Sequence, residues 1–198
     1  AGGGGGGAVA VPSVLIFLSI VMQEGQTLIK DYQRNRIMAF FDPATYADTE
    51  AYQQLNSVIA IGSGQLWGKG LNNTDIASVK NGNFLPESQT DFIFAIIGEE
   101  LGFIGSAVVI LLLILIAMRC VSIARVAKDT AGMVIAVGIG ALIGIQGFMN
   151  IAVATMMMPN TGLPLPFVSY GLSSLVSMYI GIGFVLNVGL QRKNLYNF

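Results

Sequence analysis

The sequence contains no histidine and a single cysteine, Cys120, so the residues for several common chemistries are missing. A Ser-His-Asp triad, a histidine-based zinc site and a disulfide framework are therefore excluded for this chain. Any reaction must use carboxylates, lysine, arginine, tyrosine or hydroxyl groups. Ten basic and eleven acidic residues give a formal net charge of −1, and this balance gives no indication of nucleic-acid binding.

Charged residues are also scarce, at 11% of the chain against 54% hydrophobic residues. This composition is typical of a membrane protein. Four apolar stretches are long enough to cross a hydrocarbon core of about 30 Å at about 1.5 Å per residue: 2–23, 92–118, 131–158 and 172–190. The first is the weakest because it opens with a glycine run, and glycine is a poor helix former. The chain also lacks an initial methionine, so we expect an internal or truncated start with earlier helices before it.

Basic residues set the expected orientation. Two short clusters lie between the second and third stretches and after the fourth: Arg119, Arg125 and Lys128, then Arg192 and Lys193. The connection 159–171 has no Lys or Arg, so the positive-inside rule places both clusters in the cytoplasm. We therefore predict an all-α, polytopic membrane helix bundle in which about four spans are present. Its parts are a first span at 1–23, a large, partly helical extracellular loop at 24–91, and 92–198 with three spans and a cytoplasmic tail.

The segment FLPESQTDFIF brings two carboxylates, Glu87 and Asp91, to the outer edge of the second span. If a helix already runs from Pro86, these two side chains share one face, because they are four residues apart. Acids at a membrane boundary suit chemistry on a lipid-linked substrate. The alternative is that Ser88 and Asp91 form the capping box of a helix start, with the acids meeting the helix dipole.

Glu99 and Glu100 follow farther along the same span and would lie inside the bilayer if the helix were straight. An intramembrane acid is a functional candidate, although hydrogen bonding between closely packed helices is an equally good explanation. Successive helical residues point about 100° apart. We therefore expect only one of the two glutamates to face the interior of the bundle.

Two further segments could contact a phosphate. The glycine-rich run IGSGQLWGKG would let backbone amides approach an anion, with Lys69 adding charge. It lacks the spacing of a P-loop, and an ordinary glycine-rich turn is the alternative. The run KDYQRNR contains Arg34 and Arg36. It would either bind pyrophosphate or form a solvated surface helix.

The connection 159–171 reads PNTGLPLPFVSYG, with three prolines and two glycines, so it cannot be helical. Irregular backbone is tolerated at membrane depth only where protein or a water-filled cavity satisfies its polar groups. The composition therefore predicts either a re-entrant loop that lines a cavity or a simple surface turn.

Taken together, these motifs resemble the SEDS family (shape, elongation, division and sporulation), and the match runs from about Leu28 to Arg192. The four parts stand in the family's order: KDYQRNRI, YQQLNSVIAIGSGQLWGKGL, FLPESQTDFIFAIIGEELGF and MPNTGLPLPFVSYGLSSL. TGLPLPFVSYG is closest to the RodA type, since FtsW-type members usually carry a lysine where Thr161 stands. Two residues depart from the family pattern: Gln89 replaces a histidine, and Leu172 replaces a common glycine.

The resemblance implies a ten-helix integral membrane glycosyltransferase that polymerises lipid II into glycan strands during cell elongation. The chain would hold the seventh to tenth helices, and this part alone is expected to be inactive. A class B penicillin-binding protein transpeptidase is the implied partner. Asp91 matches the family's catalytic acid, and we predict that it is the general base, with Glu87 assisting it. Ser169, Tyr170 and Ser173 are predicted to line the acceptor or lipid groove.

Some functional alternatives remain open at this stage. The pyrophosphate could be met by Lys69, Arg34 or Arg36, by a divalent cation, or by basic residues on other helices. A lipid II flippase would use Glu99 and Glu100 along a path at the membrane midplane. The remaining alternatives are an FtsW-like or sporulation relative, and a scaffold that only recruits the transpeptidase.

Overall fold

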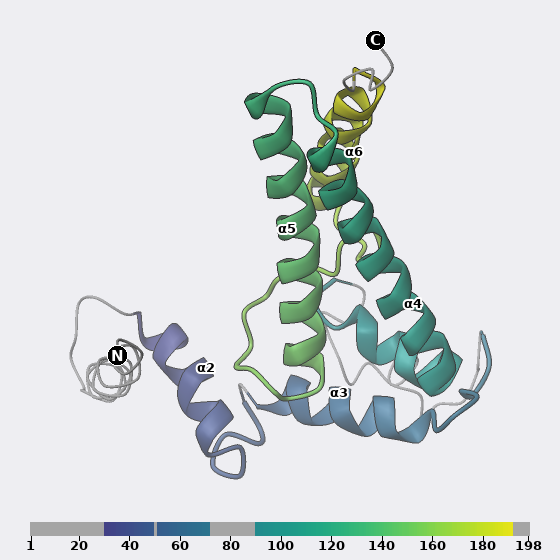
Figure 1. Ribbon diagram of the computed structural model, residues 1–198. Coiled ribbons are helices and arrows are strands. Elements are labelled where there is room, and N and C mark those ends of the chain that lie inside the picture. Colours follow the sequence, from purple (N-terminus) through teal and green to yellow (C-terminus); the bar gives the residue numbers. More distant parts are fainter. Residues whose placement is uncertain (1–29, 50, 72–89, 192–198) are drawn as a thin grey trace, which may run out of the picture. The chain divides into compact units, whose positions relative to one another are not determined.

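The computed structural model describes residues 30–49, 51–71 and 90–191, and this part of the chain forms five helices and no strand (Figure 1). The expected all-α fold is therefore confirmed. The chain divides into two compact units, residues 1–51 and 52–198, which are described separately below. The predicted first span at 2–23 lies outside the described residues.

Helix α2, Asp31–Phe41, is formed by the described residues of the first unit. It begins after Lys30, whose backbone N–H donates to Oε1 of Gln33 at 3.3 Å. It ends before Asp42, whose Oδ2 accepts a 2.6 Å hydrogen bond from Oγ1 of Thr45 in the following turn. The basic run around Arg34 is therefore helical, as the surface-helix interpretation predicts.

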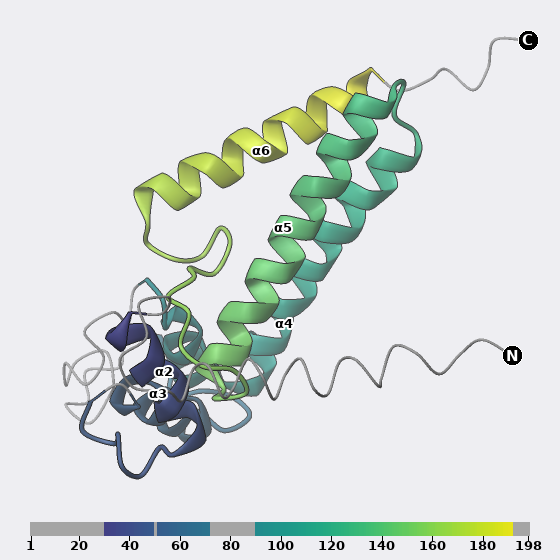
Figure 2. The same cartoon turned by 90° about the vertical axis from the view of Figure 1, so that its left-hand side faces the viewer.

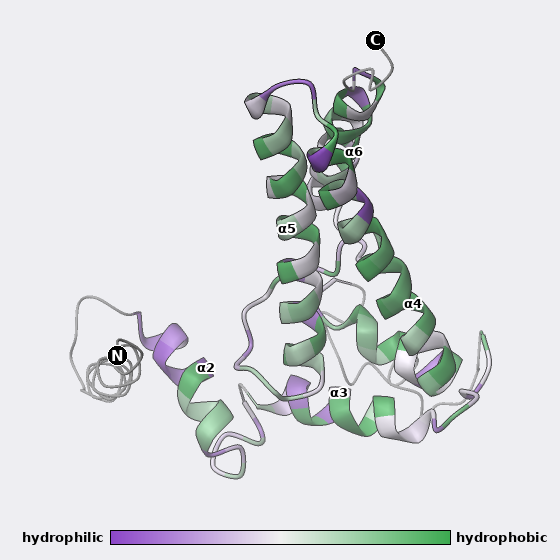
Figure 3. Cartoon of the chain, viewed as in Figure 1, coloured by the Kyte–Doolittle hydropathy of each residue, from purple (hydrophilic) through white to green (hydrophobic). Residues whose placement is uncertain are grey.

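Three helices of the second unit are long and apolar enough to cross a membrane: α4, Ile93–Arg125; α5, Thr130–Ala154; and α6, Leu172–Leu190. Their residues are mostly hydrophobic (Figure 3). Helices are thereby confirmed at the three later predicted spans, with α4 running farther than expected and α5 ending four residues earlier. A tight turn joins α4 to α5, and Oδ1 of Asp129 caps α5 by accepting from the Gly132 N–H at 3.1 Å.

Helices α4 and α5 lie side by side and run in opposite directions (Figures 1 and 2). Helix α6 packs against both of them near the turn where α4 ends and α5 begins. The buried face of α5 repeats at intervals of three or four residues: Gly132, Ala136, Gly140, Ile143, Gly147 and Asn150. Small side chains at this spacing allow close approach between membrane helices. The apolar core between the helices includes Leu113, Met178 and Val185.

Helix α3, Tyr52–Ser63, crosses the lower end of α5 in Figure 1. The last carbonyls of a helix have no partner within it, and α3 supplies two buried side chains to those of α5. Nε2 of Gln54 donates to the carbonyl of Val153 at 3.1 Å, and Oγ of Ser57 donates to that of Ala154 at 2.8 Å. The exposed face of α3 is apolar and includes Ile59.

Helix α4 is broken at Gly102, where φ is 65° and ψ is −164°. This backbone region is essentially restricted to glycine. The segment 93–101 therefore has its own direction and is not collinear with 103–125. The depth of Glu99 and Glu100 in a membrane consequently does not follow from a straight helix, and that assumption of the sequence analysis is wrong.

A loop at 64–70 fills this break. In a continuous helix the carbonyls of residues 99 and 100 would accept from the N–H groups of residues 103 and 104. Here the loop takes over all four: Lys69 and Gly70 donate to Glu99 and Glu100 at 2.9 and 3.0 Å, and Phe103 and Ile104 donate to Gln65 and Leu66 at 2.8 and 3.2 Å. The broken helix therefore leaves none of these four groups unpaired.

Candidate functional site

The backbone just before α4 is held by three different elements. The carbonyl of Thr90 accepts from Oγ of Ser169 at 2.5 Å, and the carbonyl of Asp91 accepts from Nδ2 of Asn150 at 2.7 Å. The next carbonyl, of Phe92, accepts from the Ala95 N–H at 2.9 Å within the first turn of α4. The Phe92 side chain is fully buried. The backbone of the segment that carries Asp91 is thus fixed on both sides.

The capping box of Ser88 and Asp91 stays a prediction, because Ser88 lies outside the described residues. The residue that flanks α4 on its N-terminal side is Phe92, which makes no side-chain capping bond. Asp91 lies one residue farther out, half-buried. It contributes a backbone carbonyl to the packing of α5, and its carboxylate stands at the junction between the loop region and the membrane helices.

The proline-rich connection runs back along α5, as the re-entrant interpretation predicts (Figure 2). Nε2 of Gln146 donates to the Pro164 carbonyl at 2.9 Å, and Nδ2 of Asn150 donates to the Leu163 carbonyl at 2.7 Å. Gln146 lies about two turns before the end of α5, roughly 12 Å along its axis. Leu165 is buried against the helices. The two amide side chains therefore satisfy backbone that has no helical partners.

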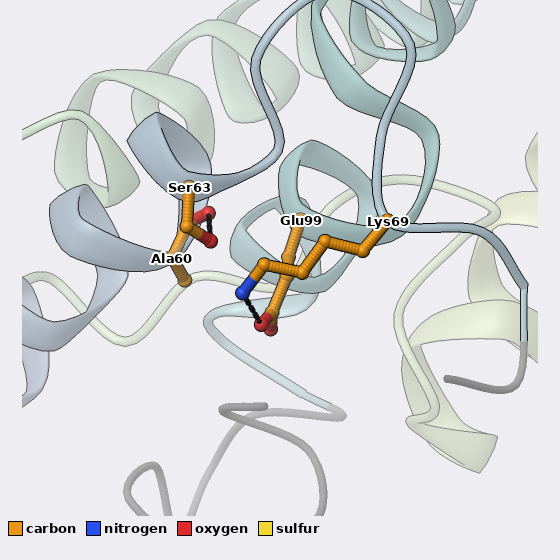
Figure 4. Close-up of polar contacts among 4 residues, drawn as sticks. All are labelled: Ala60, Ser63, Lys69 and Glu99. Carbon is orange, nitrogen blue, oxygen red and sulfur yellow. Dashed lines mark hydrogen bonds and ion pairs between the residues drawn. The ribbon is translucent and has the colours of Figure 1, made fainter. Parts of the chain in front are cut away.

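Lys69 and Glu99 form an ion pair beneath the loop that fills the α4 break (Figure 4). Nζ of Lys69 lies 2.8 Å from Oε1 of Glu99, and the Glu99 side chain is only 2% exposed. Glu100 is half-buried. The expectation that one of the two glutamates faces the interior is confirmed, and Glu99 is that residue. Burial of this carboxylate is offset by the lysine ammonium group.

An apolar groove of about 640 Å³ opens beside the α4 break, between α3, α4 and α5. Its lining includes Ile61, Phe94, Ser106, Ile110 and Ile151. Phe94 lies about one helical turn along the chain from Asp91. The apolar groove therefore begins close to the segment that carries the Asp91 carboxylate.

The comparisons with known proteins identify the family. The sequence profile described as "Cell cycle protein", which groups FtsW, RodA and SpoVE, matches residues 4–194. The chain belongs to this family. The resemblance to the SEDS family is confirmed, and with its three long apolar helices the chain is part of a multi-pass protein of the bacterial membrane.

Among relatives of the family, the chain is 40% identical over 163 residues to the probable peptidoglycan glycosyltransferase FtsW of Geobacter metallireducens, covering 82% of this chain and 42% of that protein. It is also 40% identical over 187 residues to the peptidoglycan glycosyltransferase MrdB of Escherichia coli K12, covering 94% of this chain and 49% of the relative. The chain thus spans about half the length of the curated relatives it matches.

A solved structure shares the fold. It has a TM-score of 0.68 and 26% sequence identity, and the match covers 94% of this chain and 48% of the other. That structure is described as showing the structural coordination of polymerization and crosslinking by a peptidoglycan synthase complex. The membrane helix bundle of this family member therefore has an independent structural counterpart.

The predicted phosphate-binding residues have different outcomes. In the glycine-rich run, the Lys69 and Gly70 amides donate to carbonyls at the α4 break, and the Lys69 side chain is engaged by Glu99. Arg36 lies on α2, with its guanidinium 5.9 Å from the ring centre of Tyr32. Arg34 is on the same helix. Pyrophosphate binding by these residues stays a prediction.

The remaining predicted residues differ in exposure and in contacts. Glu87 lies outside the described residues. Ser169 is buried, and its hydroxyl accepts from the Leu165 N–H at 2.7 Å while donating to Thr90, so it joins the re-entrant loop to the Asp91 segment. Tyr170 is exposed, and Ser173 is exposed in the first turn of α6. Their predicted role in a groove stays a prediction.

Sequence reasoning missed Gln146 and Asn150. The available signal was two amide side chains four residues apart in an apolar stretch, where a buried polar group needs a partner. Within 30–49, 51–71 and 90–191, no three His, Cys, Asp or Glu side chains gather as metal ligands would. The divalent cation therefore stays a prediction.

Proposed function

We propose that the complete protein is a peptidoglycan glycosyltransferase that polymerises lipid II, with Asp91 as the general base. Glycan polymerisation requires removal of a proton from a sugar hydroxyl as undecaprenyl pyrophosphate departs. A positioned carboxylate can accept that proton, and general base catalysis contributes roughly 10² to 10⁴-fold. Because the chain covers less than half of its named relatives, this activity belongs to the whole protein.

The observation that carries this proposal is the fixed backbone around Asp91. Three consecutive carbonyls, from Thr90 to Phe92, accept hydrogen bonds from the re-entrant loop, from α5 and from α4. A general base must stay within hydrogen-bond reach of the proton it removes. That requirement is met when the backbone of residues 90–92 is held by hydrogen bonds, whereas a solvated surface acid would not need such bonds.

The apolar groove supports a lipid-linked substrate. Its walls at Phe94, Ile110 and Ile151 suit an isoprenoid chain, while the Asp91 segment lies at the junction where a sugar head group would remain in water. Such a division between an apolar tail and a polar head matches a membrane-bound glycan precursor. The substrate would therefore reach Asp91 from within the membrane.

The orientation and the partner are parts of the same proposal. The positive-inside rule places the α4–α5 turn, with Arg125 and Lys128, in the cytoplasm and α3 on the outer side, where a cell wall is built. A class B penicillin-binding protein transpeptidase is the proposed partner. The structural neighbour supports this, because its description joins polymerization with crosslinking in one complex. The RodA-type motif at 161–171 supports cell elongation as the process in which the protein acts.

The test uses the complete protein, purified with its transpeptidase partner in a form whose crosslinking site is inactive, and incubated with lipid II. We expect glycan strands from the native protein and a loss of at least about 100-fold with Asp91→Asn, since the amide cannot accept the proton. Expression, partner binding and the thermal unfolding midpoint should be unchanged. Undiminished polymerisation by this variant would remove Asp91 as the base.

The flippase alternative predicts a different result, namely lipid II movement across vesicles with no polymer. Broken helices and buried acids are found along transport paths, and α4 has both features. However, the loop 64–70 fills the break, and Lys69 pairs with Glu99. These contacts close the site that a transport path would use, so they favour the polymerase.

A further inference from the structure

We propose that Asn150 is a positioning residue for Asp91, acting through the backbone of Asp91 and not on the substrate. This inference rests on the proposed function, because it assigns a role in the reaction that Asp91 is proposed to catalyse. Asn150 lies on α5, far along the chain from Asp91, and is 1% exposed. Its side chain therefore acts from inside the helix bundle.

The contacts of Asn150 join two segments at a single nitrogen. Nδ2 carries two hydrogens, and it donates to the carbonyls of Asp91 and Leu163, both at 2.7 Å. The reversed amide would direct its oxygen at two carbonyl oxygens, so the hydrogen-bond network fixes the orientation of the side chain. The Asp91 segment and the re-entrant loop are thus tied to the same point on α5.

The chemistry of the side chain also indicates a specific task. Oδ1 of Asn150 is buried and has no hydrogen-bond partner within the part of the chain that the structure describes. A buried polar atom without a partner destabilises the fold relative to an apolar residue of the same size. The two hydrogen bonds that Nδ2 donates are therefore the favourable interactions that this side chain makes.

The carbonyl that Asn150 holds belongs to the same residue as the proposed base. A shift of this backbone moves the Cα of Asp91 and with it the carboxylate. Displacement of a catalytic group by about 1 Å lowers a rate by about 10²-fold. Ser169 holds the preceding carbonyl, which limits how far the segment can move when Asn150 is lost.

Gln146 provides a matched control. It lies on the same helix face one turn away, and its amide also donates to the re-entrant loop, at the Pro164 carbonyl. Within the described residues, its amide makes no hydrogen bond to residues 90–92. If both amides served only to hold the loop, their removal would have similar effects. If Asn150 positions Asp91, its removal will have the larger effect on turnover.

The experiment compares Asn150→Ala with Gln146→Ala in the complete protein with its partner and lipid II. We expect Asn150→Ala to lower kcat by about 10 to 100-fold, with KM within about twofold of native and an unfolding midpoint close to that of Gln146→Ala. Gln146→Ala should retain kcat within about threefold. Equal kcat values for the two variants, or an effect on KM alone, would overturn the proposal.

A second experiment, in the Asp91→Glu variant, shows whether Asn150 acts through Asp91. In Asp91→Glu the carboxylate is already displaced by one carbon, so adding Asn150→Ala should lower the remaining kcat by less than about threefold, because residues acting as one unit are not additive. A full additional loss would contradict the proposal. If Asn150→Ala does not fold, Asn150→Ser keeps one donor and takes its place. Failure of both to fold would show a structural role only.

The two proposals fail in distinguishable ways. Polymerisation by Asp91→Asn at the native rate would remove the base itself, whatever Asn150 does. An inactive Asp91→Asn protein together with an Asn150→Ala protein of native kcat would leave the proposed function intact and remove the positioning role alone.

Discussion

Replacing Gly102 by alanine tests the account of the break in α4. The backbone there has φ 65° and ψ −164°, a conformation that places a non-glycine residue under roughly 1 to 3 kcal/mol of strain. A Cβ at this position would lie 2.3 Å from the Gly68 nitrogen and 2.7 Å from the Leu66 oxygen. These are backbone atoms, so the loop 64–70 must shift to accommodate it.

Displacement of the loop would let α4 straighten, which removes the strain but also removes the hydrogen bonds of the loop. The loop makes four backbone hydrogen bonds with residues 99–104, each contributing about 0.5 to 1.5 kcal/mol. Straightening α4 would restore two helical bonds, so about two are lost in net terms. We expect Gly102→Ala to lower the free energy of unfolding by about 1 to 3 kcal/mol, whether the break persists under strain or α4 straightens with about two bonds fewer.

The measurement is thermal unfolding of the complete protein in detergent, followed by loss of the monodisperse chromatographic peak. Gly62→Ala is the matched control, because Gly62 lies within helix α3 and a Cβ there meets nothing within 4 Å. Alanine at that site should be neutral or stabilise by up to about 1 kcal/mol. An unfolding midpoint of Gly102→Ala equal to that of Gly62→Ala would refute the reasoning.

Two other predictions concern charge and orientation. Lys69→Met should destabilise the protein by about 1 to 3 kcal/mol, less than for a fully buried pair because the Lys69 side chain is 28% exposed, and adding Glu99→Gln should recover most of the loss. Denaturation of the single and double variants checks this, and a double variant no better than Lys69→Met alone would count against it. In cells whose protein carries no other reactive cysteine, Trp67→Cys should react with a membrane-impermeant maleimide and Lys128→Cys only after permeabilisation, since the positive-inside rule places them on opposite sides. The reverse labelling pattern would overturn the orientation.

The sequence was sufficient to predict the apolar helices, because length and hydropathy decide whether a segment can span a membrane. The three later spans were therefore found within a few residues at most ends. The re-entrant course of 159–171 was one of two options, since its prolines exclude a helix but do not say which helix side chains will satisfy the loop. Gln146 and Asn150, which do so, could be interpreted only once the loop was seen beside α5.

The break at Gly102 could not be predicted because the residues that stabilise it are distant in the sequence. GEELGF is compatible with a continuous helix, since single glycines occur within membrane helices. The loop 64–70 makes the broken form favourable by supplying four backbone partners. For the same reason the glycine-rich run looked like an anion site: glycines that allow close approach to a phosphate also allow close approach to another backbone.

The filled break in α4 also separates two stages of assembly. The unbroken segment 103–125 is about 34 Å long at about 1.5 Å per residue, enough to cross the hydrocarbon core without 93–101. Insertion into the membrane therefore does not depend on the loop, whereas the direction of 93–101 depends on the contacts of the loop with residues 99–104. A variant that blocks docking would be inserted with normal topology and yet lack the native direction of 93–101, so correct membrane insertion alone does not report an assembled site.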